Sequence, residues 1–568
     1  MSPRALLFLG LAASAFSREL NVALDGSDGG DGSPARPFRT VQHAAEVAQS
    51  GDVVTVHAGV YRERVHPATG NVTFQAAPGE NVTISGAEPV VGWARVVNTT
   101  DTWKVVLPSY ATFGNFNPYA DLIRGAKRGA LRFVVAGRPR GPMPAVRANS
   151  PPPPPLFPAR AGDWFSPGGR VHHTGAVYLA DAWLDEAASL ADVLLPVTRR
   201  SPPPQWFATV DGDDGTGTQY LANLLWIRPR GAAATISAGS PSWRYGTKPF
   251  NGSAGPCAAF ILTGDVLRFD NIDFGAGATA LDFSAAAGPG AGAALEVRVG
   301  DRWGALLGSG NVPSTGDWEA WQNFSVPITP TAGPQNISLV FLAPGYAAGD
   351  TTIYAQFGAQ ADPNAGSVEV NVRQTVLYPA EPYVDYVTVR GFTLERAATQ
   401  WAPPSSEQVG IVGPHWSRGW VVEENEVRYA TCSCISLGKY GDGTDNTNDK
   451  GQADPYTACV YRALENGWHK DRVGSHVVRN NHVHHCGQTG VVGSLGGAFS
   501  VITGNSIHDC FVNRTFNGAE MAGIKLHGAV DVVIADNHIY NSGNFGIWLD
   551  VRLTRTTLRL TTASQLRP

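Results

Sequence analysis

A five-residue pattern repeats near the end of the sequence, where GIKLH (Gly523–His527) returns 23 residues later as GIWLD (Gly546–Asp550). Three strands of about five residues each, together with their turns, occupy about 22–25 residues. The interval therefore corresponds to one coil of a parallel β-helix, a fold in which each coil stacks on its neighbours. Such a solenoid can also accommodate 568 residues, which is more than an ordinary compact domain contains.

The same register extends over earlier coils. Equivalent turns begin at Asn425, Asn481, Asn505 and Asn537, and equivalent strands occupy residues 434–438, 490–494, 523–527 and 546–550. We predict that the four asparagines form a structural ladder at one corner of the β-helix and take no part in catalysis.

Side chains alternate between the two faces of a strand. The inner positions of the last two coils are Ile524, Leu526, Ile547 and Leu549, and the outer positions are Lys525, His527, Trp548 and Asp550. Because neighbouring strands lie about 4.8 Å apart, we expect His527 beside Asp550 and Lys525 beside Trp548.

The six cysteines add one constraint. Cys486 and Cys510 each follow their coil's asparagine by five residues, so they fall on adjacent coils, where either a disulfide or a stack of buried thiols would fit. Cys432 and Cys434 have neither the spacing nor the second pair of a zinc site. We therefore expect no metal and no cofactor.

Composition limits the partners. The formal net charge is −5 and no basic run occurs, so nucleic acid is not an expected partner.

The N-terminus places Arg4 before an apolar run, residues 5–11, with small residues up to Ser17. This pattern predicts a signal peptide over residues 1–17 and secretion. No other apolar run is long enough to span a membrane. Seven Asn-x-Ser/Thr sequons, at Asn71, Asn81, Asn98, Asn251, Asn323, Asn336 and Asn513, are typical of a glycoprotein.

Residues 18–95 contain a glycine-rich loop, a short helix at about Thr40 to Ala48, and a strand from Val53. This order resembles the N-terminal cap of right-handed parallel β-helix enzymes that act on polysaccharides. Residues 96–240 break the pattern with proline runs, and we expect an inserted β-sandwich there.

Residues 241–346 are similar to a family 6 carbohydrate-binding module. The likeness covers about residues 264–343, including the motif TGDW (Thr315–Trp318), and it implies a jelly-roll β-sandwich. Trp318 and Trp321 either stack on sugar rings or belong to the sandwich core.

An aromatic ring beside a carboxylate is typical of a sugar subsite, although a solvated sheet face with an ion pair is the alternative. Residues 351–550 strongly resemble the β-xylosidases built on a right-handed parallel β-helix, through motifs such as CSCISLGKYGDG and GAEMAGIKLHGAVDVVIADNHIYNSGNFGIWLD. The resemblance implies an all-β, pectate-lyase-like solenoid with an inserted β-sandwich. It implies that Asp550 is the nucleophile of a retaining glycoside hydrolase, and that Glu520, Lys525 and His527 lie near its pocket and contact the substrate. Trp548, as the aromatic ring beside the carboxylate, is expected to contact the substrate as well.

The same family uses a glutamate as acid/base one coil beyond the nucleophile. Neighbouring strands suit this chemistry, because the two carboxyl groups of a retaining enzyme lie about 5–5.5 Å apart. One coil of 23 residues after Asp550 is about position 573, which is beyond the last residue, Pro568. Residues 551–568 depart from the family pattern, and we expect neither the acid/base nor a further coil in them.

These observations predict a secreted hydrolase that acts on a polysaccharide or xylo-oligosaccharide, inactive if it lacks its acid/base. Two alternatives stay open. A polysaccharide lyase on the same fold would use a basic residue such as Lys525, and a non-catalytic protein would only bind carbohydrate.

Overall fold

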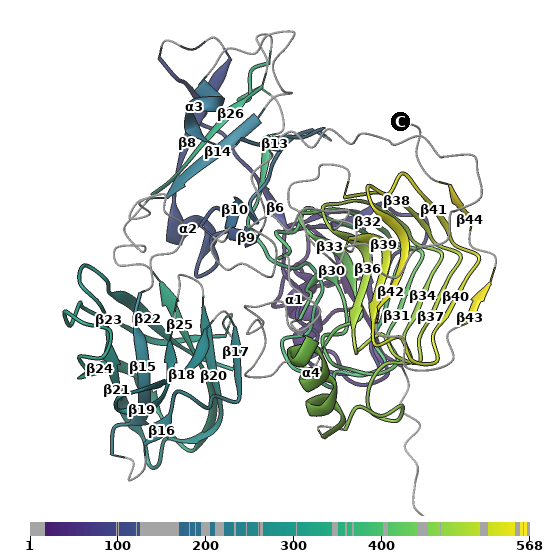
Figure 1. Ribbon diagram of the computed structural model, residues 1–568. Coiled ribbons are helices and arrows are strands. Elements are labelled where there is room, and N and C mark those ends of the chain that lie inside the picture. The colour runs from purple at the N-terminus through teal and green to yellow at the C-terminus, as the bar shows by residue number, and fades with distance from the viewer. Residues whose placement is uncertain are drawn as a thin grey trace, which may run out of the picture.

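The structure is a computed structural model. It describes residues 17–97, 99, 101–120, 122–124, 170–180, 182–187, 189–194, 205–210, 221–231, 235–245, 247–259, 261, 265–300, 302, 304–342, 350–357, 361–365, 368–400, 407–439, 453–465, 467–511, 521–550, 557–559 and 562–564. A solenoid of stacked coils forms the main body, and two β-sandwiches lie on one side of it (Figure 1).

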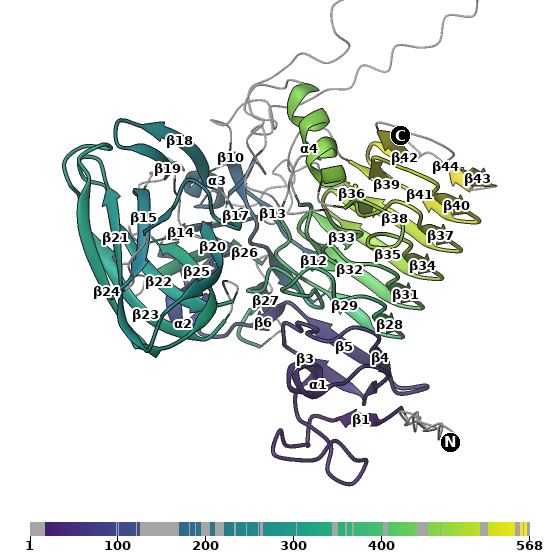
Figure 2. The same ribbon diagram turned by 90° about the horizontal axis from the view of Figure 1, so that it is seen from below.

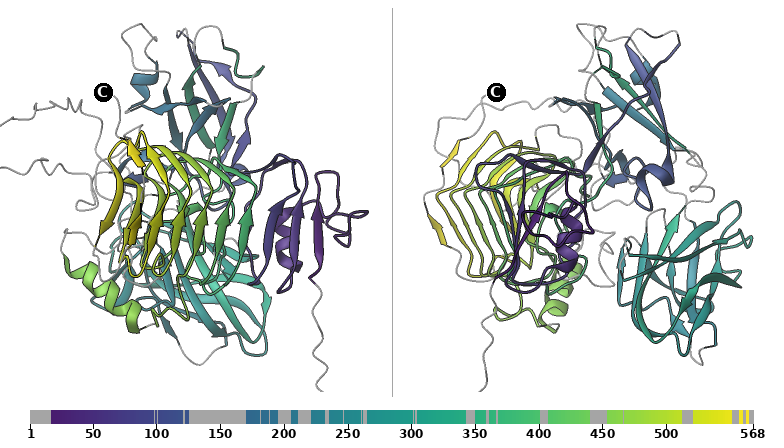
Figure 3. Two further views of the ribbon diagram at one scale, coloured as in Figure 1. Left: turned by 90° about the vertical axis from the view of Figure 1, so that its right-hand side faces the viewer. Right: turned by 180° about the vertical axis from the view of Figure 1, so that it is seen from behind.

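Three parallel sheets run along the solenoid. The first sheet contains, in order, β1 (Glu19–Val22), β2 (Val53–Val56), β4 (Thr73–Ala76), β28 (Thr388–Arg390), β31 (Val421–Glu423), β34 (Val477–Arg479), β37 (Val501–Thr503), β40 (Val533–Ala535) and β43 (Thr557–Arg559). The second contains β3 (Gly59–Tyr61), β5 (Val82–Ser85), β29 (Thr393–Glu395), β32 (Glu426–Ala430), β35 (His482–Cys486), β38 (Ser506–Cys510), β41 (His538–Tyr540) and β44 (Thr562–Ser564). The third contains β30 (Gly410–Val412), β33 (Ser433–Ser436), β36 (Thr489–Ser494), β39 (Ala522–His527) and β42 (Phe545–Asp550). The predicted all-β parallel β-helix is confirmed, and its successive coils are visible in Figure 3.

Apolar columns fill the interior because one inner position of each coil stacks on the next. In the first sheet the buried column is Val54, Phe74, Val389, Val422, Val478, Ile502 and Ile534. The helix α1 (Val41–Val47) lies at the N-terminal end, with Val41 and Ala44 buried (Figure 2). The side chain of Thr40 accepts a hydrogen bond from the His43 amide and caps this helix.

The asparagine ladder is present as predicted. The side-chain amide of Asn425 donates to the side-chain oxygen of Asn481 at 3.1 Å, Asn481 donates to Asn505 at 3.0 Å, and Asn505 donates to Asn537 at 2.9 Å. All four side chains are buried. The ladder fixes the register of one coil on the next, which is the register that aligns the outer columns.

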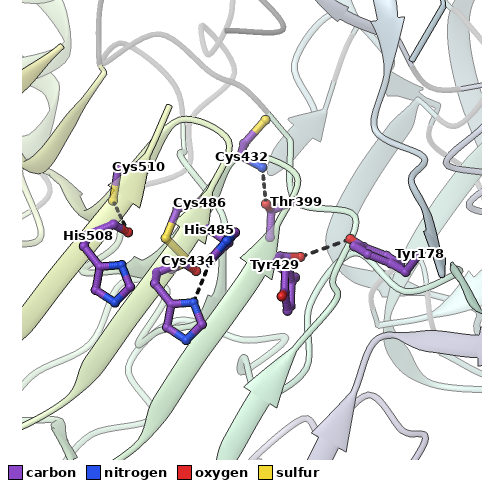
Figure 4. Close-up of a disulfide and its surroundings, with 10 residues drawn as sticks. Tyr178, Thr399, Tyr429, Cys432, Cys434, His485, Cys486, His508 and Cys510 are labelled. Atoms are coloured by element: carbon purple, nitrogen blue, oxygen red, sulfur yellow. Dashed lines mark hydrogen bonds between the residues drawn. A yellow bond between two sulfur atoms is a disulfide. The ribbon is translucent and has the colours of Figure 1, made fainter. Parts of the chain in front are cut away.

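The disulfide corrects one prediction. Cys486 and Cys510 do face each other on adjacent coils, but Cys486 forms its disulfide with Cys434, and Cys510 is a buried free thiol (Figure 4). The bond joins the second sheet to the third and closes a loop of 52 residues. That loop contains α4 (Ala453–Glu465), which packs against the solenoid through Cys459 and Ala463.

A small inserted domain leaves the solenoid after β5. One sheet contains β7 (Ala94–Arg95), β8 (Thr102–Pro108), β26 (Asp350–Gln356), β14 (Gln205–Val210) and β13 (Asp185–Glu186). A second contains β6 (Ala87–Pro89), β27 (Val368–Asn371), β11 (Val177–Leu179) and β12 (Ala182–Trp183), and β9 (Leu122–Arg124) pairs with β10 (Arg170–His173). Two short helices, α2 (Ser109–Phe113) and α3 (Leu190–Leu194), accompany them. The domain therefore includes β26 and β27, which follow the jelly roll in the sequence.

The jelly roll consists of two antiparallel sheets. One contains β18 (Lys248–Gly252), β19 (Gly255–Ala259), β15 (Asn223–Pro229), β21 (Ala278–Ala286) and β24 (Gln322–Thr331), with β16 (Ile236–Ser237) beside β15. The other contains β17 (Trp243–Tyr245), β20 (Val266–Asp273), β25 (Pro334–Leu342), β22 (Ala293–Val299) and β23 (Leu306–Val312). The two sheets enclose their own apolar core, so the jelly roll is a separate packing unit.

Beyond Asp550, where we expected no further coil, β43 and β44 extend the first and second sheets. The third sheet has no such addition in the described part of the chain, and β42 is its last strand.

Candidate functional site

The outer strip of the third sheet brings four predicted site residues together. β39 and β42 pair in parallel, with Lys525 opposite Trp548 and His527 opposite Asp550. Both predicted pairs are therefore confirmed, although the members of each pair are 23 residues apart in the sequence.

Asp550 is in contact with two basic side chains. The Lys525 ammonium donates to Oδ2 of Asp550 at 3.3 Å, and Nδ1 of His527 lies 4.0 Å from the same oxygen. The Lys525 ammonium also lies 4.7 Å from the ring centroid of Trp548, within the range of a cation–π interaction. Lys525 thus links the carboxylate to the aromatic ring.

The three polar side chains differ sharply in exposure. The side chains of Lys525 and His527 are 0% and 1% exposed, whereas that of Asp550 is 34% exposed. A buried ammonium is stable only when a counter-charge is close to it. Asp550 is therefore both the counter-charge of Lys525 and the member of the group that a solute can reach.

These neighbours keep Asp550 ionised. Interaction with the His527 side chain, followed by the charge of Lys525, lowers the pKa of Asp550 well below its usual range, although partial burial opposes the shift. A carboxylate that stays deprotonated at neutral and mildly acidic pH can act as a nucleophile or stabilise a developing cation.

Aromatic rings border the carboxylate. Phe545 and Trp548 meet edge to face with ring centroids 4.9 Å apart, and Phe545 is 50% exposed. Such rings offer apolar faces to a sugar.

Sequence reasoning missed Trp468, which lies outside the repeat. Its indole N–H donates to the carbonyl of Leu495 at 3.0 Å, and the Leu495 amide donates to the carbonyl of His527 at 3.0 Å. A side chain at Gly528 would lie 3.4 Å from the Trp468 ring. Trp468 therefore borders the strip from the segment that follows α4, a contact that the coil period could not predict.

The outer columns continue into β36. Ser494 pairs with His527, and Val492 pairs with Lys525. In the described strands of the third sheet, Asp550 is the single acidic residue.

The remaining predicted residues lie elsewhere. Glu520 is outside the described residues. In the jelly roll, the Trp318 ring packs directly against Gly288 and the apolar core, and its carbonyl accepts from the Asn223 side chain at 2.9 Å. Trp321 is half-buried beside Gly252. The geometry of Trp318 matches the core alternative.

Comparison with known proteins gives the setting for this site. A profile described as carbohydrate binding module (family 6) matches residues 237–353, and one described as right handed beta helix region matches residues 460–565. An arabinoxylan arabinofuranohydrolase of Paenibacillus polymyxa is 27% identical over 38% of this chain and 34% of its own length. An endo-1,4-beta-xylanase A of Thermoclostridium stercorarium is 38% identical over 15% of this chain and 16% of its own length.

A solved structure extends the likeness to nearly the whole chain. XylC in complex with xylose is 29% identical, with a TM-score of 0.57, and the match covers 94% of this chain and 60% of that one. The chain is related to xylan-acting glycoside hydrolases. This chain matches about a third of the length of the arabinoxylan arabinofuranohydrolase.

Among the helices that the structure describes, none has the length and apolar character needed to cross a membrane.

Proposed function

We propose that this protein is a secreted, retaining β-xylosidase-type glycoside hydrolase with Asp550 as its nucleophile. The observation that carries the proposal is a partly exposed carboxylate held ionised by the buried Lys525 and His527 and bordered by Trp548. The similarity to a structure described as a complex with xylose supports xylosides as the substrate class.

Asp550 would attack the anomeric carbon of the bound sugar. The attack forms a covalent glycosyl-enzyme as the bond to the departing oxygen breaks, and water then releases the sugar. Lys525 and His527 would hold the carboxylate in position, and the Trp548 ring would pack against the sugar face. Because Lys525 contacts both Asp550 and Trp548, it would couple substrate position to nucleophile position.

The departing oxygen needs a proton. A retaining enzyme places the donor carboxyl about 5–5.5 Å from the nucleophile, close to the spacing of about 4.8 Å between neighbouring strands. That position lies on the side of β42 opposite β39, where no strand of the described residues pairs with it. The described strands of the third sheet contain no second acidic residue beside Asp550. We therefore propose that residues 1–568 on their own provide the nucleophile without the proton donor and turn over substrates with poor leaving groups about 10²–10⁴-fold more slowly.

Leaving-group dependence tests both parts of the proposal. 2,4-Dinitrophenyl β-xyloside needs no proton on its leaving group, whereas phenyl β-xyloside does. We expect turnover of the first, acceleration by azide (which accepts the glycosyl group without a general base), and turnover of the second that is lower by about 10²–10⁴-fold. Asp550→Asn should abolish both, with Asp536→Asn as the matched control because Asp536 is an exposed turn residue of the same coil.

Each result discriminates. Comparable turnover of the two xylosides would contradict the missing donor, and an active Asp550→Asn variant would contradict the nucleophile. A product that absorbs in the ultraviolet would identify a lyase instead. Xylo-oligosaccharide binding without turnover of either xyloside would identify a non-catalytic binding protein.

Secretion is a separate part of the proposal. The asparagines of the five sequons that the structure describes are all exposed; they are Asn71, Asn81, Asn251, Asn323 and Asn336. Protein collected from the medium of an expressing cell should lose mass on treatment with an N-glycosidase and should lack residues 1–17. Retention of that segment in the cell-associated protein would contradict secretion.

A further inference from the structure

A second cluster of polar side chains occupies the outer face of the second sheet, away from the strip that contains Asp550. Outer positions of β32, β35, β38 and β41 align in two columns. One column contains Glu426, His482, Ser506 and His538, and the other contains Arg428, His484, His508 and Tyr540. His485 and Asp509 lie beside these columns.

Three donor atoms in this cluster converge. Oε1 of Glu426 lies 3.1 Å from Nε2 of His484 and 4.0 Å from Nδ1 of His482. One donor atom from each of the three residues lies within 4.8 Å of the other two. Ligands bound to one zinc ion at about 2.0–2.2 Å in tetrahedral geometry lie a little over 3 Å apart. Small rotations of the side chains would therefore bring all three onto one ion.

The hydrogen-bond chain behind His482 fixes its tautomer. A carboxylate only accepts, so Nδ1 of His508 donates to Asp509 at 2.6 Å. The other nitrogen of a neutral His508 then accepts from Nε2 of His482, 2.7 Å away. Nδ1 of His482, 4.0 Å from Oε1 of Glu426, is then left with a lone pair. A lone pair and a carboxylate oxygen attract each other only through a cation or a proton.

His484 has an equivalent support. Without a metal, Nε2 of His484 donates to Oε1 of Glu426 at 3.1 Å, and Nδ1 of His484 lies 2.7 Å from Nδ1 of His485. A metal ion would take the place of the proton on Nε2, and the proton on Nδ1 could then be donated to His485. Metal-binding histidines generally donate their second N–H in this way, which orients the ring and strengthens the ligand. The rings of His484 and His508 also stack, with centroids 5.0 Å apart and an interplanar angle of 2°.

One cation already lies nearby. Nη1 of Arg428 is 3.2 Å from Oε1 of Glu426, but the Arg428 guanidinium is also held by Glu395 at 2.8 Å. Oε2 of Glu426 accepts from Thr393 at 3.2 Å. A metal ion would therefore compete with Arg428 for a single oxygen, while Glu395 retains the guanidinium.

We propose that Glu426, His482 and His484 form a binding site for one divalent transition-metal ion, with Zn²⁺ as the best match to two imidazoles and a carboxylate. His508, Asp509 and His485 orient the ligands. The side chains of His482 and Glu426 are 49% and 31% exposed, so an ion can reach the site from solvent. The ion would join β32 to β35, and the 55-residue segment between Glu426 and His482 overlaps the disulfide-closed loop from Cys434 to Cys486.

Titration of the full-length, tag-free, chelator-treated protein with Zn²⁺ tests the site. We expect about one ion per chain by calorimetry, and a Co²⁺ complex with visible absorption bands typical of four-coordinate nitrogen and oxygen ligands. The double variant His482→Gln and His484→Gln should lose this binding. His538→Gln is the matched control, because His538 lies in the same column two coils further on and outside the donor set.

The orienting chain has its own test. His508→Phe keeps a ring to stack on His484 but removes the acceptor for His482, and it should weaken Zn²⁺ binding by about 10–100-fold without changing the stoichiometry. Zn²⁺ should also raise the unfolding temperature of the wild type and the His538→Gln variant, and not that of the double variant. Equal Zn²⁺ affinity in wild type and the double variant, with both folded by circular dichroism, would overturn the proposal.

Discussion

At the scale of single residues, the candidate site depends on one carboxylate with two buried basic neighbours. The alternation of a strand and a period of 23 residues were enough to predict that Asp550 faces His527 and that Lys525 faces Trp548. The sequence could not predict that Lys525 and His527 would be almost fully buried while Asp550 stays accessible. That contrast arises because β39 lies between two strands, whereas β42 has a paired strand on one side only in the part of the chain that the structure describes.

The pH dependence of activity follows from these neighbours. Because they lower the pKa of Asp550, the nucleophile should stay ionised below the usual aspartate pKa of about 3.9. Lys525→Met removes one of the causes, so the acid limb of kcat/KM for 2,4-dinitrophenyl β-xyloside should move to higher pH. An unchanged acid limb in this variant would show that Lys525 has no electrostatic effect on the nucleophile.

The same pair predicts a stability effect. Because the folded-state pKa of Asp550 is lowered, its contribution is fully present above about pH 3.9 and is lost as the pH falls toward the folded-state value. At neutral pH, Asp550→Asn removes a counter-charge of the buried Lys525 ammonium and should cost about 1–3 kcal/mol, less than a fully buried pair because Asp550 is one-third exposed.

A double-mutant cycle checks this explanation. Lys525→Met combined with Asp550→Asn removes both charges, so urea unfolding should show the double variant to be more stable than Asp550→Asn alone. Additive losses would contradict a direct interaction between the two side chains.

At the scale of the elements, the asparagine ladder and the disulfide hold the coils in register. The ladder was predictable, because the same residue recurs at the same turn of each coil. The disulfide partner of Cys486 was not predictable, since Cys434 and Cys486 lie in different sheets. The repeat of the coils aligns only positions that lie within the same sheet. The position of Trp468 beside the strip could not be predicted either, because the segment that contains it has no counterpart in the other coils.

Position in the ladder should decide the cost of removing an asparagine. Asn505 exchanges side-chain hydrogen bonds with both Asn481 and Asn537, whereas Asn537 has a ladder partner only in Asn505 within the described coils. Each buried polar group left unsatisfied costs about 1–3 kcal/mol. Asn505→Ala should therefore destabilise the β-helix more than Asn537→Ala, as measured by the urea midpoint of the solenoid transition. Equal midpoints would show that the ladder does not act as a continuous chain.

The disulfide should stabilise the solenoid by restricting its unfolded state. For a loop of 52 residues, the chain-entropy estimate is about 4 kcal/mol. Replacing Cys434 and Cys486 by serine should lower the free energy of unfolding by up to this amount. Cys432→Ser, which changes a buried cysteine outside the disulfide two residues away, should have a smaller effect. Peptide mapping that finds Cys486 linked to Cys510 instead would contradict the assigned pairing.

At the scale of the whole molecule, two insertions are nested inside one solenoid. The inserted domain interrupts the β-helix between β5 and β28, and the jelly roll in turn interrupts the inserted domain between β14 and β26. The compositional break after residue 96 and the module motifs near Thr315 predicted that insertions exist. The return of β26 and β27 to the inserted domain could not be predicted, because antiparallel pairing between distant strands leaves no period in the sequence.

The pairing of β14 with β26 has a practical consequence. Val210 and Thr351 are register partners at the same end of this antiparallel pair, so the chain departs for the jelly roll and comes back at neighbouring points. A tight hairpin of two residues bridges such a gap. The entire jelly roll should therefore be removable, or exchangeable for another module, while the solenoid keeps its shape.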